Sequence, residues 1–202
     1  MIVGPILLPA LVGIKTDKPR MIDYGGVLTP PNGGVAQTLM RAGTRHALDI
    51  TPPIMPAEPT GRTWSAHLRL AKLYGVAFPF FQDGLDIGIP GKPVVDGAGQ
   101  TGSWIKLRSL RRGYTIRFGQ ALSLIRNGRR YLYFAAEQVT ADIQGGAILA
   151  IFPMLRVRHN DGDSCEIAKP MIQGSLSGNE VGWERQTAPF FDFGTITITE
   201  DE

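Results

Sequence analysis

The chain has 202 residues, 43% of them hydrophobic and 19% charged, which excludes wholesale disorder and suits one domain, or one domain with a small insert. The single cysteine, Cys165, excludes a disulfide within the chain and a zinc site of the usual cysteine-based kind. The net charge of +3 is modest for a dedicated nucleic-acid-binding protein. The 25 glycines and 15 prolines favour short strands joined by many turns.

The N-terminal stretch carries no charge before Lys15. It is shorter than a membrane span, is interrupted by Pro5 and Pro9, and lacks the preceding basic residues of a signal peptide. We therefore expect an extended arm or first strand that is buried against another part of the protein. Since nothing else suggests a membrane span or an export signal, the sequence predicts a protein made and used in a cytoplasm.

Residues 34–52 are predicted to form a hairpin. Its strands would be Val35–Arg41 and Arg45–Ile50, around a turn at Ala42-Gly43-Thr44. The prolines that follow, from Pro52 to Pro59, predict a stiff connector outside any sheet interior.

Residues 63–75 are predicted to form the one clear helix. Thr60 or Thr63 can cap its start, and Gly75 can end it. An apolar stripe along it predicts packing against a larger body. The stripe consists of Trp64, Leu68 and Ala71, widened by Leu70, Leu73 and Tyr74.

Residues 91–157 are predicted to be all β and to form a small closed or rolled barrel. The strongest local signal is the Asn127-Gly128 turn, which predicts a hairpin between Gly119–Ile125 and Arg130–Ala136. Ala147–Phe152 is a fully apolar strand that ends at Pro153.

Three further strand-like runs follow in the C-terminal part, at Glu166–Gln173, Glu180–Arg185 and Phe190–Thr199. In the last run the alternation predicts isoleucines facing in and threonines facing out, and the acidic end at residues 200–202 is expected to fray.

The string Gly97-Ala98-Gly99-Gln100-Thr101-Gly102 matches the G-x-G-x-x-G pattern of dinucleotide-binding proteins. That fingerprint requires a helix directly after it and an acidic residue about twenty positions on. The following residues alternate like a strand, and no Asp or Glu occurs between Gly102 and Glu137. We therefore interpret the string as a glycine-rich turn between two strands, and an enzyme that uses this loop is the least favoured reading.

No other motif predicts catalysis, a cofactor or a metal site. The loop Asn160-Asp161-Gly162-Asp163 with Glu166 carries oxygen ligands but lacks calcium-loop spacing, so a polar turn is preferred. A second class of function remains open, because arginines mixed with aromatic residues are typical of barrels that bind single-stranded nucleic acids. That mixture here comprises Arg111, Arg112, Arg117, Arg126, Arg129 and Arg130 with Trp104, Tyr114, Tyr131 and Tyr133.

Charge is segregated along the chain. Residues 101–158 have a net charge of +8 and residues 159–202 a net charge of −7. Segments of opposite charge can pair within one chain, can join the basic face of one copy to the acidic face of the next, or can be two solvated faces.

Several short motifs occur in a characteristic order over residues 34–200. They are the Trp64 helix followed by Leu73-Tyr74-Gly75, then Val94–Gly102, Gly119–Leu124, Val139–Asp142, Ile151–Arg156, Ala168–Leu176, Trp183 and a terminal Ile-Thr-Glu strand. In this order the chain resembles the distal tail proteins, which are minor tail proteins at the tail tip of long-tailed bacteriophages. The resemblance implies a mainly β fold: a tail-tube-like β-sandwich of residues 1–90 and 158–202 with the flanking helix at 63–75. It also implies that residues 91–157 form an inserted, small, oligonucleotide/oligosaccharide-binding-type (OB-like) barrel.

The same resemblance implies a structural virion protein with no catalytic residues and no cofactor. Its expected partners are further copies of itself in a homohexameric ring, the tail tube protein, the tail hub or baseplate protein, and tail fibres, with no membrane and no specific nucleic acid. Its expected place is the virion tail tip, after assembly in the host cytoplasm. A carbohydrate- or single-stranded-nucleic-acid-binding β-domain, or another tail component such as a tail terminator, remains the alternative.

A closed ring needs two different faces of one protomer that complement each other. Opposite charges on the two C-terminal segments supply such faces. The predicted interface residues are Trp104, Arg111, Arg112, Arg126, Arg129, Arg130, Asp161, Asp163, Glu166, Glu180 and Glu184.

Overall fold

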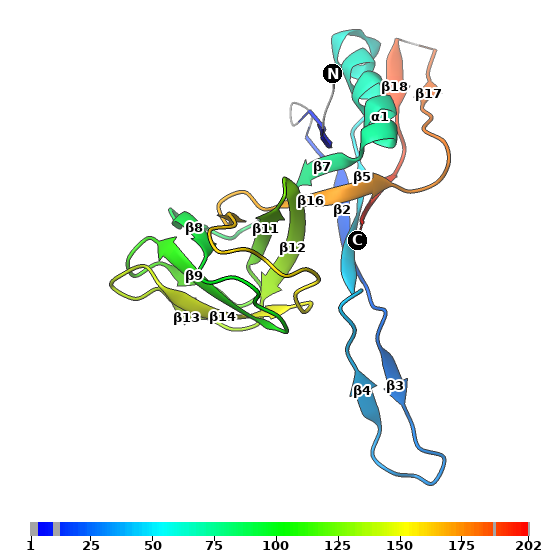
Figure 1. The fold of residues 1–202 in the computed structure, drawn as a ribbon. Coiled ribbons are helices and arrows are strands. Elements are labelled where there is room, and N and C mark those ends of the chain that lie inside the picture. The colour runs from blue at the N-terminus through cyan, green and yellow to red at the C-terminus, as the bar shows by residue number, and fades with distance from the viewer. Residues whose placement is uncertain (1–3, 10–12, 188, 202) are drawn as a thin grey trace. The chain divides into compact units, whose positions relative to one another are not determined.

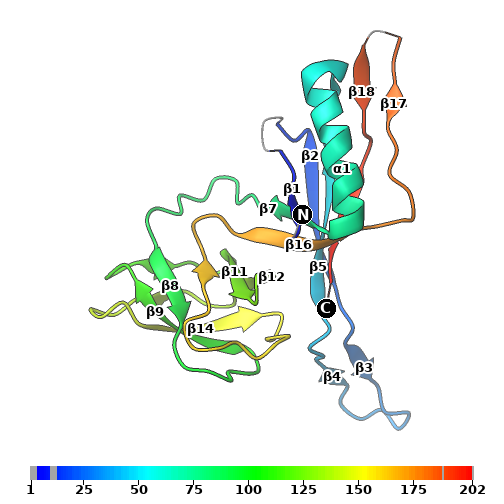
Figure 2. The same cartoon turned by 45° about the horizontal axis from the view of Figure 1, so that its top comes forward.

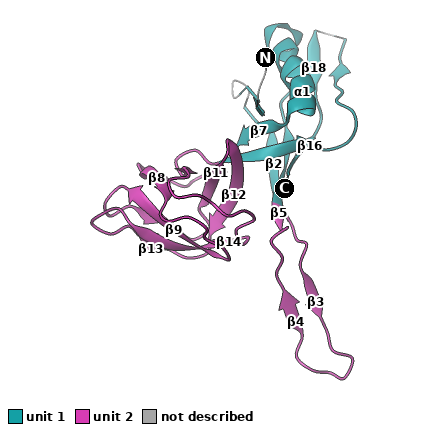
Figure 3. Ribbon diagram, viewed as in Figure 1, with its two compact units in different colours: residues 1–20, 46–79, 171–201 teal, residues 21–45, 80–170, 202 magenta. Residues whose placement is uncertain are grey.

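The fold is described from a computed structural model that covers residues 4–9, 13–187 and 189–201 (Figure 1). Residues 1–3 and 10–12 of the predicted N-terminal arm lie outside the described residues, as does Glu202. Over these residues the protein is mainly β with one α-helix and a nearly closed barrel-like sheet, so the predicted fold class is confirmed. The chain divides into two compact units, which are described separately (Figure 3).

The first unit comprises residues up to 20, residues 46–79 and residues 171–201. Its main sheet has six strands, and the first, β1 (Ile6–Leu7), pairs in parallel with β7 (Val76–Pro79). In spatial order the strands are β1 (Ile6–Leu7), β7 (Val76–Pro79), β16 (Met171–Leu176), β19 (Ile196–Glu200), β5 (Arg45–Thr51) and β2 (Thr16–Ile22). A smaller sheet joins β17 (Glu184–Arg185), β18 (Phe190–Asp192) and β6 (Met55–Pro56).

The helix α1 (Arg62–Tyr74) follows a short irregular turn, η1 (Ala57–Gly61), and lies beside β18 in two views (Figures 1 and 2). The buried stripe of Trp64, Leu68 and Ala71 is confirmed, and Gly75 ends the helix with a φ of 81°. The predicted widening is wrong for Leu73 and Tyr74, which are 75% and 48% exposed at the end of the helix. The expected threonine cap is also absent: no side chain caps the first turn of α1 among the described residues.

The hairpin predicted at residues 34–52 is wrong. The observed hairpin pairs β3 (Gly26–Leu28) with β4 (Gln37–Leu39), whereas β5 pairs with β19. The alternating residues of β5 fit a central strand equally well, and their partner lies about 150 residues away in the chain.

The expected fraying at residue 200 is wrong as well, because Glu200 is buried in β19 and its Oε2 accepts a hydrogen bond from the His46 amide at 2.8 Å.

The second unit comprises residues 21–45 and 80–170. Its six-stranded sheet runs in the order β15 (Cys165–Glu166), β11 (Ala121–Arg126), β12 (Arg129–Ala135), β14 (Ala147–Phe152), β9 (Trp104–Leu110) and β8 (Gly91–Val95). A bridge between Val94 and Ser164 brings the two edge strands together and nearly closes the barrel. Two short strands, β10 (Thr115–Ile116) and β13 (Val139–Thr140), pair separately. One apolar core fills the barrel, with Ile105, Leu107, Leu124 and Leu149 among its fully buried side chains.

The barrel extends beyond the segment 91–157 that the sequence suggested. The strand β15 belongs to it because Cys165 and Glu166 pair with Leu124 and Ser123 of β11. The tight turn at Asn127-Gly128 is confirmed, with φ angles of 50° and 77° that asparagine and glycine tolerate best. The chain therefore needs residues up to about 170 to complete this unit.

Candidate interaction surfaces

The glycine-rich loop lies between β8 and β9, and strand β9 occupies the place where a dinucleotide site would need a helix. Its amides have partners within the protein: Gly97 N donates to Asp161 Oδ1 at 2.8 Å and Gly99 N to the His159 carbonyl at 2.9 Å. The Gln100 amide group fills the loop, because its Nε2 donates to the Asp96 carbonyl and its Oε1 accepts from Lys106 N. The loop is thus held by its own side chains and backbone.

The acidic loop that follows β14 pairs with arginines of the same barrel. Arg108 donates to both carboxylate oxygens of Asp161, and this contact, together with the Gly97 amide, lowers the Asp161 pKa to about 2. Arg126 Nη1 lies 3.6 Å from Asp163 Oδ2. At Asp161 and Asp163 the opposite charges therefore pair within one chain.

A bidentate ion pair joins β12 to β15. Arg130 donates to Glu166 through Nε at 2.8 Å and through Nη2 at 3.0 Å. Asp163, Glu166, Arg126 and Arg130 were all predicted to face a partner, and the structure places them in two ion pairs within one barrel, Arg126–Asp163 and Arg130–Glu166. Arg108 was not among the predicted residues, since nothing in the local pattern of β9 marks it as the partner of Asp161.

The remaining predicted residues of the barrel lie at three places. Trp104 is 54% exposed on β9, and Arg111 and Arg112 are exposed in the turn between β9 and β10. Arg129 lies with its guanidinium 5.6 Å from the centre of the Tyr131 ring. Tyr131 and Tyr133 are buried, so neither ring is available to stack on a base.

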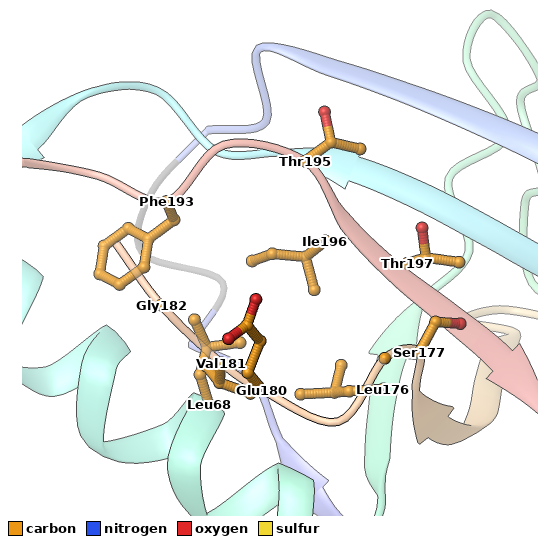
Figure 4. Close-up of a pocket in the computed structure, with 11 residues that line it drawn as sticks. Leu68, Leu176, Ser177, Glu180, Val181, Gly182, Phe193, Thr195, Ile196 and Thr197 are labelled. Atoms are coloured by element: carbon orange, nitrogen blue, oxygen red, sulfur yellow. The ribbon is translucent and has the colours of Figure 1, made fainter. Parts of the chain in front are cut away.

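Glu180 and Glu184 belong to the first unit, where Glu184 lies on β17 and Glu180 in the loop before it. Glu180 lines a pocket of about 250 Å³ (Figure 4). Leu68 and Leu176 form part of the apolar wall, and the hydroxyl groups of Ser177, Thr195 and Thr197 supply part of the polar lining. The loop that follows β16 is bound to α1, because Lys72 Nζ donates to the Leu176 carbonyl at 2.8 Å and also to the Gly178 carbonyl.

The hairpin of β3 and β4 exposes large apolar side chains along its whole length. Val27 is 64% exposed, Val35 88% and Met40 69%. At the base of the hairpin Thr44 Oγ1 donates to Asp23 Oδ1 at 2.8 Å, and Arg45 Nη2 donates to the Tyr24 hydroxyl at 2.9 Å. The two strands form a sheet of their own, with Val27 opposite Thr38.

Three further features bear on catalysis, metal binding and membrane insertion. Cys165 is buried, and its burial, with a smaller contribution from Glu166, raises the thiol pKa, which disfavours the reactive thiolate. Among the residues that the structure describes, no group of three or more His, Cys, Asp or Glu side chains could hold a metal ion. In the same part of the chain, no helix is both long and apolar enough to cross a membrane.

Comparison with known proteins gives no assignment: no family model matches the chain, and no curated protein matches its sequence.

Proposed function

We propose that this chain is a structural virion protein of a long-tailed phage and forms a ring at the tail tip. In this role it joins the tail tube protein to the hub or baseplate protein and to tail fibres. The proposal assigns it no catalytic residue and no cofactor. Assembly takes place in the host cytoplasm, and the ring contains six copies.

The observation that carries the proposal is the exposed hairpin of β3 and β4. A two-stranded hairpin is at best marginally stable in water, and its exposed Val27, Val35 and Met40 form the kind of surface that soluble proteins cover with a partner. The neighbouring strand β2 is also an edge of the main sheet, and all but one of its seven residues are exposed. Open edges and apolar hairpins are stabilised when further copies or partner proteins pair with them.

The proposal is tested by the mass of the full chain, alone and mixed with the tail tube protein of the same phage. We expect a sixfold assembly in at least one of the two samples, visible as a ring by electron microscopy. The double substitution Val27→Lys and Leu28→Lys should abolish it, because it places charges on the uncovered hairpin without touching a core. The matched control is Leu73→Lys, an exposed apolar position on α1. A wild-type chain that stays monomeric in both samples would contradict the proposal.

A carbohydrate-binding barrel is the second candidate, and the exposed face around Trp104 favours it. Ile148, Ala150 and Phe152 alternate along β14 on one face, and Ala150 is the direct neighbour of Trp104 on β9. The Phe152 ring stacks on Phe134 with 5.6 Å between ring centres, so the face is partly aromatic. A saturable change in tryptophan fluorescence with host-cell polysaccharide, lost in Trp104→Ala, would support this candidate.

A further inference from the structure

A polar hollow of about 300 Å³ opens on the second unit, between residues 86–89 and the segment from residue 111 to residue 120. Arg111, Arg112 and Arg117 line it, and all three side chains are exposed. Within the described part of the chain, none of the three forms an ion pair or a side-chain hydrogen bond with a carboxylate. They differ in this from Arg108, Arg126 and Arg130 of the same barrel, which all pair with acids.

The wall of the hollow is fixed by a chain of hydrogen bonds. The Tyr114 hydroxyl donates to the Ile87 carbonyl at 2.9 Å and accepts from Gln120 Nε2 at 2.8 Å. Gln120 is only 2% exposed, and its Oε1 accepts from the backbone amide of Arg117 at 2.9 Å. The positions from which the arginines extend are therefore ordered before any ligand arrives, which reduces the entropy lost on binding.

The turn that carries the other two arginines is held in the same way. Arg111 N donates to the Pro90 carbonyl at 2.8 Å, and Tyr114 N donates to the Arg111 carbonyl at 2.9 Å. The residue before Arg112 is thus bound to the barrel, and the second bond closes the turn, while the Arg112 side chain remains exposed.

The charge balance indicates the class of ligand. Of the described residues that line the hollow, Asp86 is the one acidic side chain, and its Oδ1 accepts from Gly88 N at 3.1 Å. Three guanidinium groups against one carboxylate leave two positive charges unneutralised. Guanidinium forks match phosphate oxygens geometrically, and a phosphomonoester carries a charge of about −1.5 to −2 at neutral pH.

We propose that this hollow, bounded by Arg111, Arg112 and Arg117, is a binding site for a dianionic phosphate group, either inorganic phosphate or the phosphomonoester of a sugar. The site lies entirely within the second unit, and its existence does not depend on ring formation.

The test is a titration of the full chain in which the NMR signals of the backbone amides of residues 111–117 are monitored. The probes are inorganic phosphate, glucose 6-phosphate, glucose, and sodium chloride at matched ionic strength. We expect saturable shifts at these amides with the two phosphates and none with glucose or chloride. Tighter binding of glucose 6-phosphate than of inorganic phosphate would identify a sugar phosphate as the ligand, and the reverse order would identify the free ion.

The variant that tests the residues is the double substitution Arg112→Gln and Arg117→Gln, which keeps the backbone amide of residue 117. We expect phosphate affinity to fall about tenfold for each arginine removed, because one charge-assisted hydrogen bond contributes roughly that factor. The matched control is Arg158→Gln, an exposed arginine of the same unit outside the hollow. Equal losses in the two variants would overturn the site. Tighter binding of an eight-residue oligothymidylate than of glucose 6-phosphate would overturn the ligand class in favour of single-stranded nucleic acid.

Discussion

Arg130 and Glu166 face each other across β11, and the guanidinium and carboxylate groups meet at 2.8 Å and 3.0 Å. Their side chains are 24% and 30% exposed, so the pair is shielded from water more than a surface ion pair. The charge segregation of the sequence has a structural explanation here, since the basic strand β12 and the acidic strand β15 flank the same strand of one barrel. Asp161, Asp163 and Glu166 therefore each pair with an arginine of the same barrel.

The first prediction concerns this ion pair. Arg130→Met should destabilise the chain by about 1–2 kcal/mol, because it leaves the Glu166 carboxylate half-buried without its bidentate partner. Urea unfolding of the full chain, monitored by its tryptophan fluorescence, measures the loss. Arg158→Met is the control, and as a surface substitution it should change stability by less than about 0.5 kcal/mol. Equal stability of the two variants would show that the pair contributes nothing.

The second prediction concerns acid stability. The Arg108 guanidinium and the Gly97 amide hold the pKa of Asp161 at about 2, below its ordinary value of 3.8. A carboxyl group with a lowered pKa in the folded state contributes stability that is present above the unfolded pKa and is lost as the pH falls through the folded pKa. The stability of the wild-type chain should thus fall between about pH 4 and pH 2. Asp161→Asn should flatten the profile in that window, whereas Asp83→Asn, at an exposed carboxylate of the same unit, should leave it unchanged.

The third prediction concerns His159, whose side chain is fully buried beside Asp163 and Arg126. Burial lowers the pKa of His159, and the hydrogen bond with Asp163 offsets this in part. The unfolded state therefore binds a proton more readily than the folded state, so stability should fall as the pH drops below about 6.5.

The slope in that range should approach at most about 1.4 kcal/mol per pH unit, the limit for one proton. Unfolding midpoints between pH 7.5 and pH 5 measure it. His159→Gln should reduce the slope whatever its effect on stability at pH 7.5, and His67→Gln on α1 serves as the control. An unchanged slope in His159→Gln would contradict the assignment.

Features that depend on neighbouring residues could be predicted from the sequence. The Asn127-Gly128 turn is set by the φ angles that these two residues tolerate, and the Trp64, Leu68 and Ala71 stripe by the helical period. The glycine-rich loop could be separated from a nucleotide site because a strand-forming sequence follows it directly.

Features that depend on pairing between distant segments could not be predicted from the sequence. The residues of β5 alternate as a hairpin strand would, and only their partner β19 decides the sheet in which they lie. The burial of Glu200 could have been predicted, because Glu200 continues the alternation of Ile196 and Ile198 and so shares their face of the strand. The ion pairs Arg108–Asp161, Arg126–Asp163 and Arg130–Glu166 join segments more than 35 residues apart, and charge counting alone could not distinguish them from contacts between copies.

The final prediction tests the central pairing of the first unit. Gly174 lies on β16 opposite Glu200 of β19, and a Cβ atom at this position would stand 1.9 Å from the Thr199 carbonyl oxygen. Backbone cannot move aside as the end of a flexible side chain can, so Gly174→Ala must separate β16 from β19. We expect a loss of about 3 kcal/mol or more, measured by urea unfolding or seen as loss of folded protein.

Gly182→Ala is the matched control, because a Cβ atom there meets no atom within 4 Å. Both substitutions add the same methyl group, so differences in the unfolded state cancel between them. If the two variants are equally stable, the register that places Gly174 opposite Glu200 is wrong. A selective loss in Gly174→Ala would instead indicate that glycine is required here because the backbones of β16 and β19 approach each other too closely for any side chain.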